Sequence, residues 1–351
     1  PAAPVIENGP DAWWRIETTV RTLRGVYDAG GGSVFAVGDG GMILEKTEKG
    51  WVSMDSPVPA SLNAVYGAAP DDIWAVGNSG VIVRYDGISW TRSDSITTSD
   101  LNCIFGFDGG TIFAAGDGGT VIRYDGASWS AVTTYFEDDV YGIWGESPDD
   151  VIAVGDSGLL MNWIGSGWLE MYGGGGRYFR GIWGSPGGDV FAVGLYGEMM
   201  RYNGESWSPV DSGTGENLYA IDGLAPDTIY AAGDHGTILY YDGSEWAVYP
   251  AVQQGSHKLH AIDISGPAKG YAVGFLGDIL ELDGVQWLLS SNPFSQSLFG
   301  TWSDPDDGIF AVGAEGSILR KTGGMWNAME YGGIQRLYEV KGFPGGDILS
   351  A

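Results

Sequence analysis

Residues 62–100 read LNAVYGAAPDDIWAVGNSGVIVRYDGISWTRSDSITTSD, and residues 101–139 read LNCIFGFDGGTIFAAGDGGTVIRYDGASWSAVTTYFEDD. The two segments are equally long and place Gly, Asp-Gly and Trp at the same positions. The first Gly of the A-V-G-x-x-G motif recurs at positions 38, 77, 116, 155, 194, 233, 274 and 313. The Trp that follows the Asp-Gly turn recurs at 51, 90, 129, 168, 207, 246, 287 and 326. The chain therefore contains eight copies of a unit of about 39 residues, with one two-residue insertion near Gln253–Lys258.

Each copy contains four short apolar runs, as expected of four β-strands. In residues 62–100 these runs are LNAVYG, DIWAVG, VIVRY and the stretch that begins at Trp90. Gly, Asn and Asp stand between the runs and tolerate the positive φ that tight hairpins require. A single four-stranded sheet cannot bury both of its faces, so the copies are expected to stack around an axis. The sequence therefore predicts an all-β fold, a β-propeller in which each copy is one blade.

The two ends of the chain determine the expected number of blades. Residues 337–351, LYEVKGFPGGDILSA, match the first two strands of a copy, and the head of the chain matches the last two, with Asn8-Gly9 at the turn. Because an unpaired half-blade leaves an open sheet edge, the sequence predicts a single domain, 1–351, of nine blades with a two-plus-two closure. Eight blades are the alternative, since propellers usually have four to eight. The expected blades are 23–61, 62–100, 101–139, 140–178, 179–217, 218–258, 259–297, 298–336, and 337–351 with 1–22.

The charge of the chain restricts its partners. It contains 45 Asp and Glu but 17 Lys and Arg, a formal net charge of −28. Binding to nucleic acid depends on neutralising phosphates with Lys and Arg, so a nucleic-acid partner is excluded. No apolar stretch is long enough to cross a bilayer, so we expect no membrane insertion. Such acidity is typical of a soluble protein in a salty or extracellular medium. We therefore expect an exported monomer, extracellular, periplasmic or at the cell surface, and the start PAAP is consistent with a trimmed export signal.

The core of the repeat resembles a known family. Residues 74–82, WAVGNSGVI, followed by DGISW at 86–90, resemble BNR-type propeller repeats, most closely the branch that includes the photosystem II assembly factors. The resemblance extends over nearly the whole chain. It implies a propeller but no particular function, because one fold carries many activities. Those assembly factors typically have seven blades and a basic patch, and the scarcity of Lys and Arg here argues against that role.

No catalytic pattern is present. The sequence contains no G-x-S-x-G, Walker or H-E-x-x-H motif. Sialidases share the propeller and use an arginine triad, but four of the arginines here occupy equivalent positions in the third strand of their copies, which indicates a structural role: Arg84, Arg123, Arg201 and Arg320. The sequence therefore predicts that the protein is not an enzyme.

Carboxylates recur in the turn between the second and third strands of the copies. They are Asp39, Asp117, Asp156 and Asp234. Turn propensity explains Asp at this position. A functional interpretation is a ring of acidic groups that attracts Ca²⁺. We expect no cofactor, and if a Ca²⁺ ion binds, these four carboxylates are its candidate ligands.

The most variable position is the second residue of the first strand, flanked by Leu-like and small residues. Because the first strand of a blade lines the central channel, this position should surround the channel mouth. Aromatic, Arg and Asn side chains suit a recognition surface. We call this set the mouth column and predict that it binds the ligand: Arg24, Asn63, Asn102, Tyr141, Arg180, Tyr219, His260, Phe299 and Tyr338.

Three functions are compatible with these features. The first is a non-enzymatic recognition propeller that binds a protein partner through the face carrying the mouth column. The second is a lectin that stacks glycans on Tyr141, Tyr219 and Tyr338. The third is a glycoside hydrolase or lyase, which would need two carboxylates in the central pocket. We expect the first.

Overall fold

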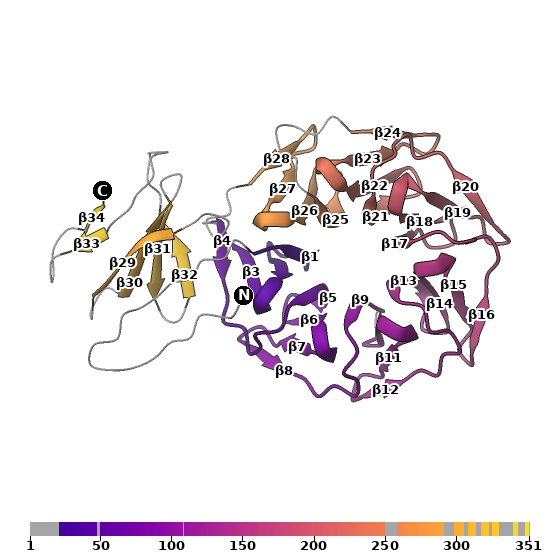
Figure 1. The fold of residues 1–351 in the computed structure, drawn as a ribbon, viewed down its shortest axis with the longest axis horizontal. Coiled ribbons are helices and arrows are strands. Elements are labelled where there is room, and N and C mark those ends of the chain that lie inside the picture. The colour runs from indigo at the N-terminus through magenta and orange to yellow at the C-terminus, as the bar shows by residue number, and fades with distance from the viewer. Residues whose placement is uncertain are drawn as a thin grey trace.

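A computed structural model describes residues 21–47, 50–107, 109–249, 258–290, 298–304, 308–313, 317–322, 325–329, 340–342 and 348–350. Seven four-stranded antiparallel sheets form a closed ring around a central axis (Figure 1). In each sheet the strands pair in chain order, with the first strand innermost and the fourth outermost. The all-β propeller fold predicted from the repeat is therefore confirmed.

Blades 1 to 4 occupy the first half of the ring. Blade 1 comprises β1 (Leu23–Asp28), β2 (Val34–Gly38), β3 (Met42–Thr47) and β4 (Gly50–Ser53). Blade 2 comprises β5 (Leu62–Ala69), β6 (Asp72–Gly77), β7 (Ile82–Tyr85) and β8 (Trp90–Arg92). Blade 3 comprises β9 (Leu101–Gly106), β10 (Ile112–Gly116), β11 (Val121–Tyr124) and β12 (Trp129–Ala131). Blade 4 comprises β13 (Val140–Ser147), β14 (Asp150–Gly155), β15 (Leu160–Trp163) and β16 (Trp168–Glu170).

Blades 5 to 7 complete the ring. Blade 5 comprises β17 (Phe179–Gly184), β18 (Val190–Gly194), β19 (Met199–Tyr202) and β20 (Trp207–Val210). Blade 6 comprises β21 (Leu218–Ala225), β22 (Thr228–Gly233), β23 (Ile238–Tyr241) and β24 (Trp246–Val248). Blade 7 comprises β25 (Leu259–Gly266), β26 (Lys269–Gly274), β27 (Ile279–Leu282) and β28 (Trp287–Leu289).

A short 3-10 turn joins the second strand of each blade to the third. These turns are η1 (Asp39–Gly41), η2 (Asn78–Gly80), η3 (Asp117–Gly119), η4 (Asp156–Gly158), η5 (Leu195–Gly197), η6 (Asp234–Gly236) and η7 (Phe275–Gly277). Because strands alternate in direction, the turns lie on the same face of the ring as the loops between blades. We call this face the mouth face. Within the described residues, no helix is long and apolar enough to cross a bilayer.

The predicted nine blades, and the alternative of eight, are wrong. The first strand β1 packs directly against β25 and β26 of the seventh copy, so the ring closes after seven blades. The eighth copy forms its own sheet, β29 (Leu298–Asp304), β30 (Gly308–Gly313), β31 (Ile318–Thr322) and β32 (Met325–Ala328), outside the ring with β32 beside β4 (Figure 1). The number of repeats gives the number of sheets in the chain. Packing between the sheets determines how many of them form the closed ring.

The predicted two-plus-two closing blade is also wrong. The tail strands β33 (Val340–Gly342) and β34 (Ile348–Ser350) pair with each other as a separate two-stranded sheet, and β33 lies against β29. The head of the chain, residues 1–20, lies outside the described residues. Since blade 1 already contacts blade 7, the ring has no place for a blade assembled from the two ends.

The seam between blades 7 and 1 is built like the other interfaces and carries additional polar contacts. Trp51 of blade 1 meets Tyr271 of blade 7 edge to face, with ring centroids 6.1 Å apart. Both rings belong to a buried cluster shared by the two blades. Lys46 forms an ion pair with Glu281 across the seam. These contacts bury the faces of blades 7 and 1 that an eighth blade would otherwise have to cover.

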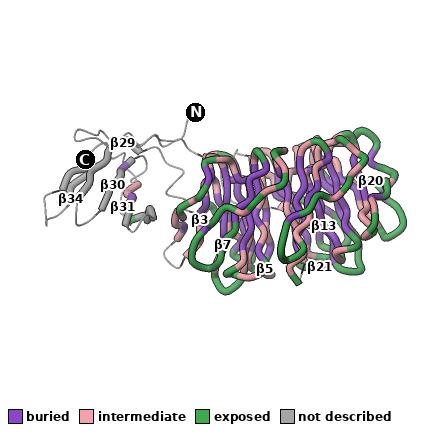
Figure 2. The backbone as a smooth tube through the Cα atoms, turned by 90° about the horizontal axis from the view of Figure 1, so that it is seen from below, coloured by how far each residue is buried: buried purple, intermediate pink, exposed green. Residues whose placement is uncertain are grey.

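The repeated Trp packs between neighbouring blades, as its regular spacing predicts. Trp90 of blade 2 lies edge to face against Phe35 of blade 1, and Trp129 lies in the same way against Trp74. The Trp residues of the seven ring blades are all buried: Trp51, Trp90, Trp129, Trp168, Trp207, Trp246 and Trp287. Figure 2 shows the buried residues along the strands and the exposed residues in the turns of both faces. Burial of large aromatic side chains is therefore the main source of cohesion between blades.

Two of the four strand-three arginines, Arg84 and Arg201, have the structural role that their regularity predicts. Arg84 pairs with Asp72 at 2.7 Å and covers the Trp74 ring at 4.9 Å. Arg201 pairs with Asp189 and lies over Phe191 at 6.0 Å. Each guanidinium therefore shields the outer side of an aromatic residue in the interface, which explains its recurrence without a catalytic role.

The first Gly of the repeat motif is required by a close approach of two chains. In blade 2 Gly77 has extended backbone, φ −167°, and a Cβ at this position would lie 2.0 Å from the Ser61 carbonyl oxygen. The same carbonyl accepts the Asn78 N–H at 2.9 Å. The loop entering each blade is thereby fastened to the turn at the mouth face.

We predict that Gly77→Ala lowers the free energy of unfolding by at least about 2 kcal/mol, because the new methyl group forces this contact apart. Gly215 is the matched control, since its Cβ would meet no atom within 4 Å. Gly215→Ala should change stability by no more than about 0.5 kcal/mol. Equal effects of the two substitutions in chemical denaturation would contradict the role assigned to Gly77.

Candidate functional site

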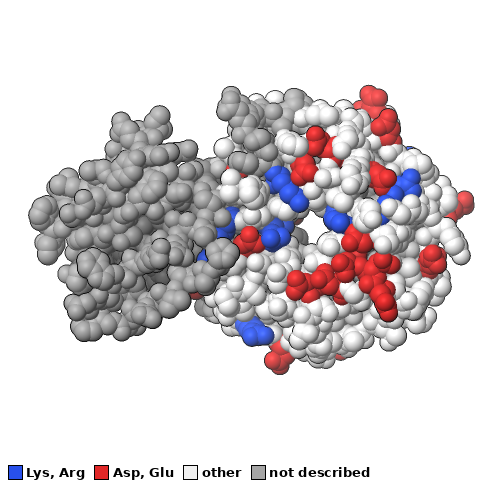
Figure 3. Space-filling view, in the orientation of Figure 1, with Lys and Arg blue, Asp and Glu red and all other residues white. Residues whose placement is uncertain are grey.

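The axis of the ring contains a cavity of about 390 Å³. The first strands of all seven blades line it. Figure 3 shows Lys and Arg side chains gathered at the central opening and Asp and Glu side chains around it. The described lining contains no Asp or Glu; its charged members are Arg24, Arg180 and Lys258, and His260 is its remaining titratable nitrogen base. The opening thus gathers three cations of an acidic protein, and two of them, Arg24 and Arg180, pair with the turn carboxylates Asp39 and Asp156.

Seven of the nine predicted mouth-column residues meet around this cavity, one from each blade: Arg24, Asn63, Asn102, Tyr141, Arg180, Tyr219 and His260. Phe299 was predicted among them, but it belongs to β29 of the sheet outside the ring, because the ring closes after the seventh copy. Tyr338 lies outside the described residues.

The polar members of the mouth column in blades 1 to 3 are held by the strand-two-to-three turn of their own blade. Arg24 Nε donates to Asp39 Oδ1 at 2.7 Å. Asn63 Nδ2 donates to Asn78 Oδ1 at 2.8 Å, and Asn102 Nδ2 donates to Asp117 Oδ1 at 2.9 Å. Asn63 also donates to the Leu101 carbonyl of the next blade at 3.0 Å. Side-chain oxygens of the turns therefore position the side chains that face the cavity.

The four aspartates predicted as candidate metal ligands all accept hydrogen bonds or ion pairs from neighbouring side chains. Asp39 and Asp117 are engaged as just described, Asp156 pairs with Arg180, and Asp234 accepts hydrogen bonds from Asn217 and Tyr219. Nowhere in the described ranges do three His, Cys, Asp or Glu side chains gather as they would around a metal ion. The four carboxylates stand on separate blades and act as acceptors for neighbouring side chains.

Blades 4 and 5 contribute a stacked pair to the mouth. The Arg180 guanidinium lies 4.0 Å from the centroid of the Tyr141 ring. Its Nη1 donates to Asp156 Oδ1 at 2.6 Å and to the Phe179 carbonyl at 2.8 Å. Burial and the nearby Asp156 carboxylate raise the pKa of Tyr141. The guanidinium therefore occupies one face of the tyrosine ring.

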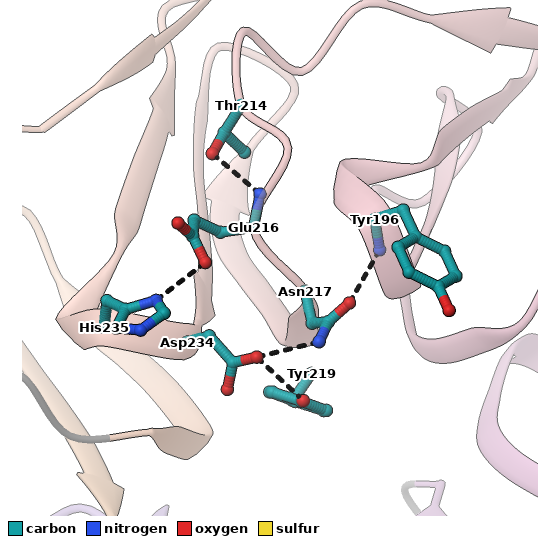
Figure 4. Close-up of polar contacts among 7 residues, drawn as sticks. All are labelled: Tyr196, Thr214, Glu216, Asn217, Tyr219, Asp234 and His235. Atoms are coloured by element: carbon teal, nitrogen blue, oxygen red, sulfur yellow. Dashed lines mark hydrogen bonds and ion pairs between the residues drawn. The ribbon is translucent and has the colours of Figure 1, made fainter.

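Blades 6 and 7 contribute a second cation–aromatic pair. Lys258 Nζ lies 3.7 Å from the centroid of the Tyr219 ring, whose hydroxyl donates to Asp234 at 3.2 Å. Figure 4 shows that Asp234 accepts hydrogen bonds from both Tyr219 and Asn217. Burial, reinforced by the positive charges of Lys258 and Arg24, lowers the pKa of His260 to about 4. His260 is therefore neutral at physiological pH.

Sequence reasoning missed Lys258. It lies at the end of the two-residue insertion that precedes blade 7, an irregularity of the repeat that by itself indicates no function. Burial and the charges of Arg24 and Arg180 lower the pKa of Lys258, whereas Asp234 opposes this shift. Among the described residues, no carboxylate lies within ion-pair distance of its ammonium. An insertion directly before a channel-lining strand was the available signal.

Sequence reasoning also missed two partly buried carboxylates farther along the first strands. The fifth residue of this strand is aromatic in blades 1 to 5: Tyr27, Tyr66, Phe105, Trp144 and Trp183. In blades 6 and 7 it is Asp222 and Asp263. Asp222 Oδ2 accepts the Ile264 N–H at 2.6 Å, and Asp263 Oδ2 accepts the Asp28 N–H at 3.1 Å. A change from aromatic to acidic at one repeat position was the available signal.

These carboxylates join the last two blades to the first. Burial raises the pKa of Asp222 to about 7, and burial together with the Asp222 charge raises the pKa of Asp263. Burial alone would raise the pKa of Asp28, but Lys269, Ser265 and the Gly30 N–H outweigh it and hold that pKa below its usual value. The fully buried Asp28 side chain pairs with Lys269 and accepts the Ser265 hydroxyl at 2.6 Å.

The fold resembles solved propellers. One solved structure, "YCF48 bound to D1 peptide", matches with a TM-score of 0.62 at 18% identity, covering 75% of this chain and 92% of that one. YCF48 from Cyanidioschyzon merolae matches with a TM-score of 0.61 at 16% identity, covering 75% and 96%. The WD40 propeller domain of Doa1 matches with a TM-score of 0.60 at 13% identity, covering 82% and 96%.

At these identities the likeness shows the fold alone. No protein-family model and no curated protein matches the chain. Similarity to YCF48 agrees at the level of fold with the propeller that the repeat predicts. Membership of the BNR-type repeat family stays a prediction.

We predict that Asp222 and Asp263 make the ring less stable at high pH. Because the pKa of Asp222 is raised on folding, its contribution is complete below its ordinary value of 3.8 and is lost as the pH rises through about 7. Asp222→Asn keeps an acceptor for Ile264 and removes the ionisation. The free energy of unfolding of both proteins should fall between pH 4 and pH 8. The fall should be smaller in the variant by at least about 1 kcal/mol, since one pKa unit corresponds to about 1.4 kcal/mol.

Exposed Glu205 provides the control for this experiment. Glu205→Gln should keep the pH profile of the parent in denaturant unfolding. A parent and an Asp222→Asn variant with parallel pH profiles would show that Asp222 is ionised in the folded protein and would contradict the prediction.

Proposed function

We propose that this chain is a non-enzymatic recognition propeller that binds a protein partner at the mouth face. The observation that carries the proposal is the mouth column: seven equivalent positions, one from each blade, hold Arg, Asn, Tyr or His around one cavity. The surrounding strands repeat the same apolar residues in every blade. Diversity placed on a repeated frame is typical of a binding surface, because the frame tolerates substitution there without loss of packing.

The chemistry of the mouth fits a peptide segment. Its side chains offer cationic, amide and phenolic groups within one opening, which suits backbone carbonyls and polar side chains of an extended chain. One of the similar propellers is described as bound to a D1 peptide. This supports peptide binding as an activity that the fold can host.

The two other candidate functions lose their support at this site. A lectin stacks glycans on aromatic rings, but Arg180 already lies over one face of Tyr141 and Lys258 lies over Tyr219. A glycoside hydrolase or lyase needs two converging carboxylates, whereas the described lining of the cavity contains none. A protein partner therefore remains the function that the mouth supports best.

Site-specific photocrosslinking tests the proposal. A benzoylphenylalanine in place of Tyr219 at the mouth should capture one discrete partner from the native source, which mass spectrometry then identifies. The same amino acid in place of Ile88 is the control, because Ile88 is highly exposed in the turn between strands three and four, on the opposite face. Capture through position 88 and not through 219 would contradict the assignment of the mouth face.

Binding measurements on the captured partner complete the test. Arg180→Ala combined with Tyr219→Ala should raise the dissociation constant at least about tenfold, which corresponds to a loss of about 1.4 kcal/mol of binding free energy. Because Arg180 pairs with Asp156 and is largely covered, we expect the double variant to lose about 1 kcal/mol of stability, which leaves it folded. Unchanged affinity in a folded double variant would show that the mouth column is not the binding site.

A further inference from the structure

The outer wall of the ring has a second opening, between blades 5 and 6. It is a groove of about 320 Å³ lined by residues that include Phe191, Val210, Tyr241 and Trp246. These side chains come from β18, β20, β23 and β24, so the groove lies at the interface of the two blades and away from the central cavity.

The aromatic residues of this groove repeat an arrangement found between blades 1 and 2. Phe191 and Trp246 meet edge to face with centroids 5.6 Å apart at 78°, and Phe35 and Trp90 meet at 5.9 Å and 78°. Tyr241 lies 5.2 Å from Trp246 at 31°, and Tyr85 lies 5.4 Å from Trp90 at 31°. The two interfaces therefore present the same aromatic surface to the residue that covers it.

The covering residue differs between these interfaces. In blade 1 it is Met54, whose Sδ accepts the Trp90 Nε1–H at 3.4 Å. Three copies further on, the equivalent Met171 accepts the Trp207 Nε1–H at 3.5 Å. The next copy has Val210 at this position, and the valine side chain has no atom that can accept the indole N–H. Position 210 therefore leaves open the space that a methionine fills elsewhere in the same protein.

Two buried donors at this interface lack acceptors. Trp246 Nε1 and Arg201 Nε have no hydrogen-bond partner among the described residues, and the Trp246 side chain is more than nine-tenths buried. A buried donor without an acceptor costs free energy, which an incoming acceptor would recover. The acidic side chains of Asp211 and Glu245 also line the groove. Their negative charge repels an anionic acceptor, so an acceptor for this groove has to be neutral.

We propose that this groove binds a methionine side chain of a partner protein, with the thioether accepting the Trp246 indole N–H and the methylene groups packing on Phe191 and Tyr241. The protein itself supplies the precedent twice, in Met54 and Met171. Thioethers contact aromatic rings favourably and adapt to irregular spaces. The site is independent of the mouth column, so it stands or falls separately from the function proposed for the mouth.

The test follows the indole N–H signal of Trp246 by nitrogen-15 NMR, assigned with Trp246→Phe. The probe is N-acetyl-methionine N-methylamide. We expect a saturable shift with a dissociation constant on the order of 1–10 mM, as suits a single side chain. The Trp207 signal is the internal control and should stay in place, because Met171 already occupies its acceptor position. The norleucine analogue, which has the same shape without sulfur, should bind at least fivefold more weakly.

Val210→Met is the matched variant, since it supplies the methionine from within the chain as in blade 1. It should weaken binding of the probe at least tenfold while the other indole signals keep their positions. A stationary Trp246 signal at tenfold the expected dissociation constant would overturn the proposal. So would equal binding of the norleucine analogue, a comparison that needs no variant, or undiminished binding to a folded Val210→Met protein.

Discussion

The structure depends on one repeated contact, the burial of an outer-strand Trp against an aromatic or large apolar residue in the second strand of the preceding blade. A four-stranded sheet of this size cannot bury its two faces alone, so each blade is stable only between two neighbours. At the seam, Trp51 of the first blade meets Tyr271 of the last at 6.1 Å, as Trp90 meets Phe35 at 5.9 Å. Once this contact is made between blades 7 and 1, every ring blade has both neighbours and the eighth copy is left outside.

The same frame explains where the protein varies. Residues that hold the blades together recur in nearly every copy, because a change there opens an interface. The second residue of the first strand projects toward the central cavity and is fixed mainly by the turn beside it, as Asn63 is by Asn78 and Asn102 is by Asp117. Such a position can change its chemistry while the blade stays intact. Variation at the mouth and uniformity in the interfaces therefore have a single physical cause.

Much of this arrangement follows from the sequence. The repeat length, the four strands of each copy, the buried Trp residues and the convergence of the mouth column on the channel could all be predicted, because each depends on contacts within one copy or between adjacent copies. The number of blades could not, since it depends on the angle between sheets, and so Phe299 was assigned wrongly to the mouth. Lys258 and Asp222 were missed because each occurs where its copy departs from the repeat, and a repeat pattern predicts only the residues that recur. Val210 could not be singled out for the opposite reason, since valine is a common strand residue. Its consequence, an indole N–H without an acceptor, depends on Trp246 in the next blade.

The central claim is that blade 1 contacts blade 7 directly, and a double-mutant cycle on Lys46 and Glu281 tests it most directly. These residues are 235 positions apart in the chain and form an ion pair across the seam, with both side chains about three-quarters covered. In a ring of seven, Lys46→Ala and Glu281→Ala should show a coupling free energy on the order of 1 kcal/mol in denaturant unfolding. If further blades stood between blades 7 and 1, the two side chains would be too far apart to interact. A coupling indistinguishable from zero would therefore contradict the seven-bladed closure.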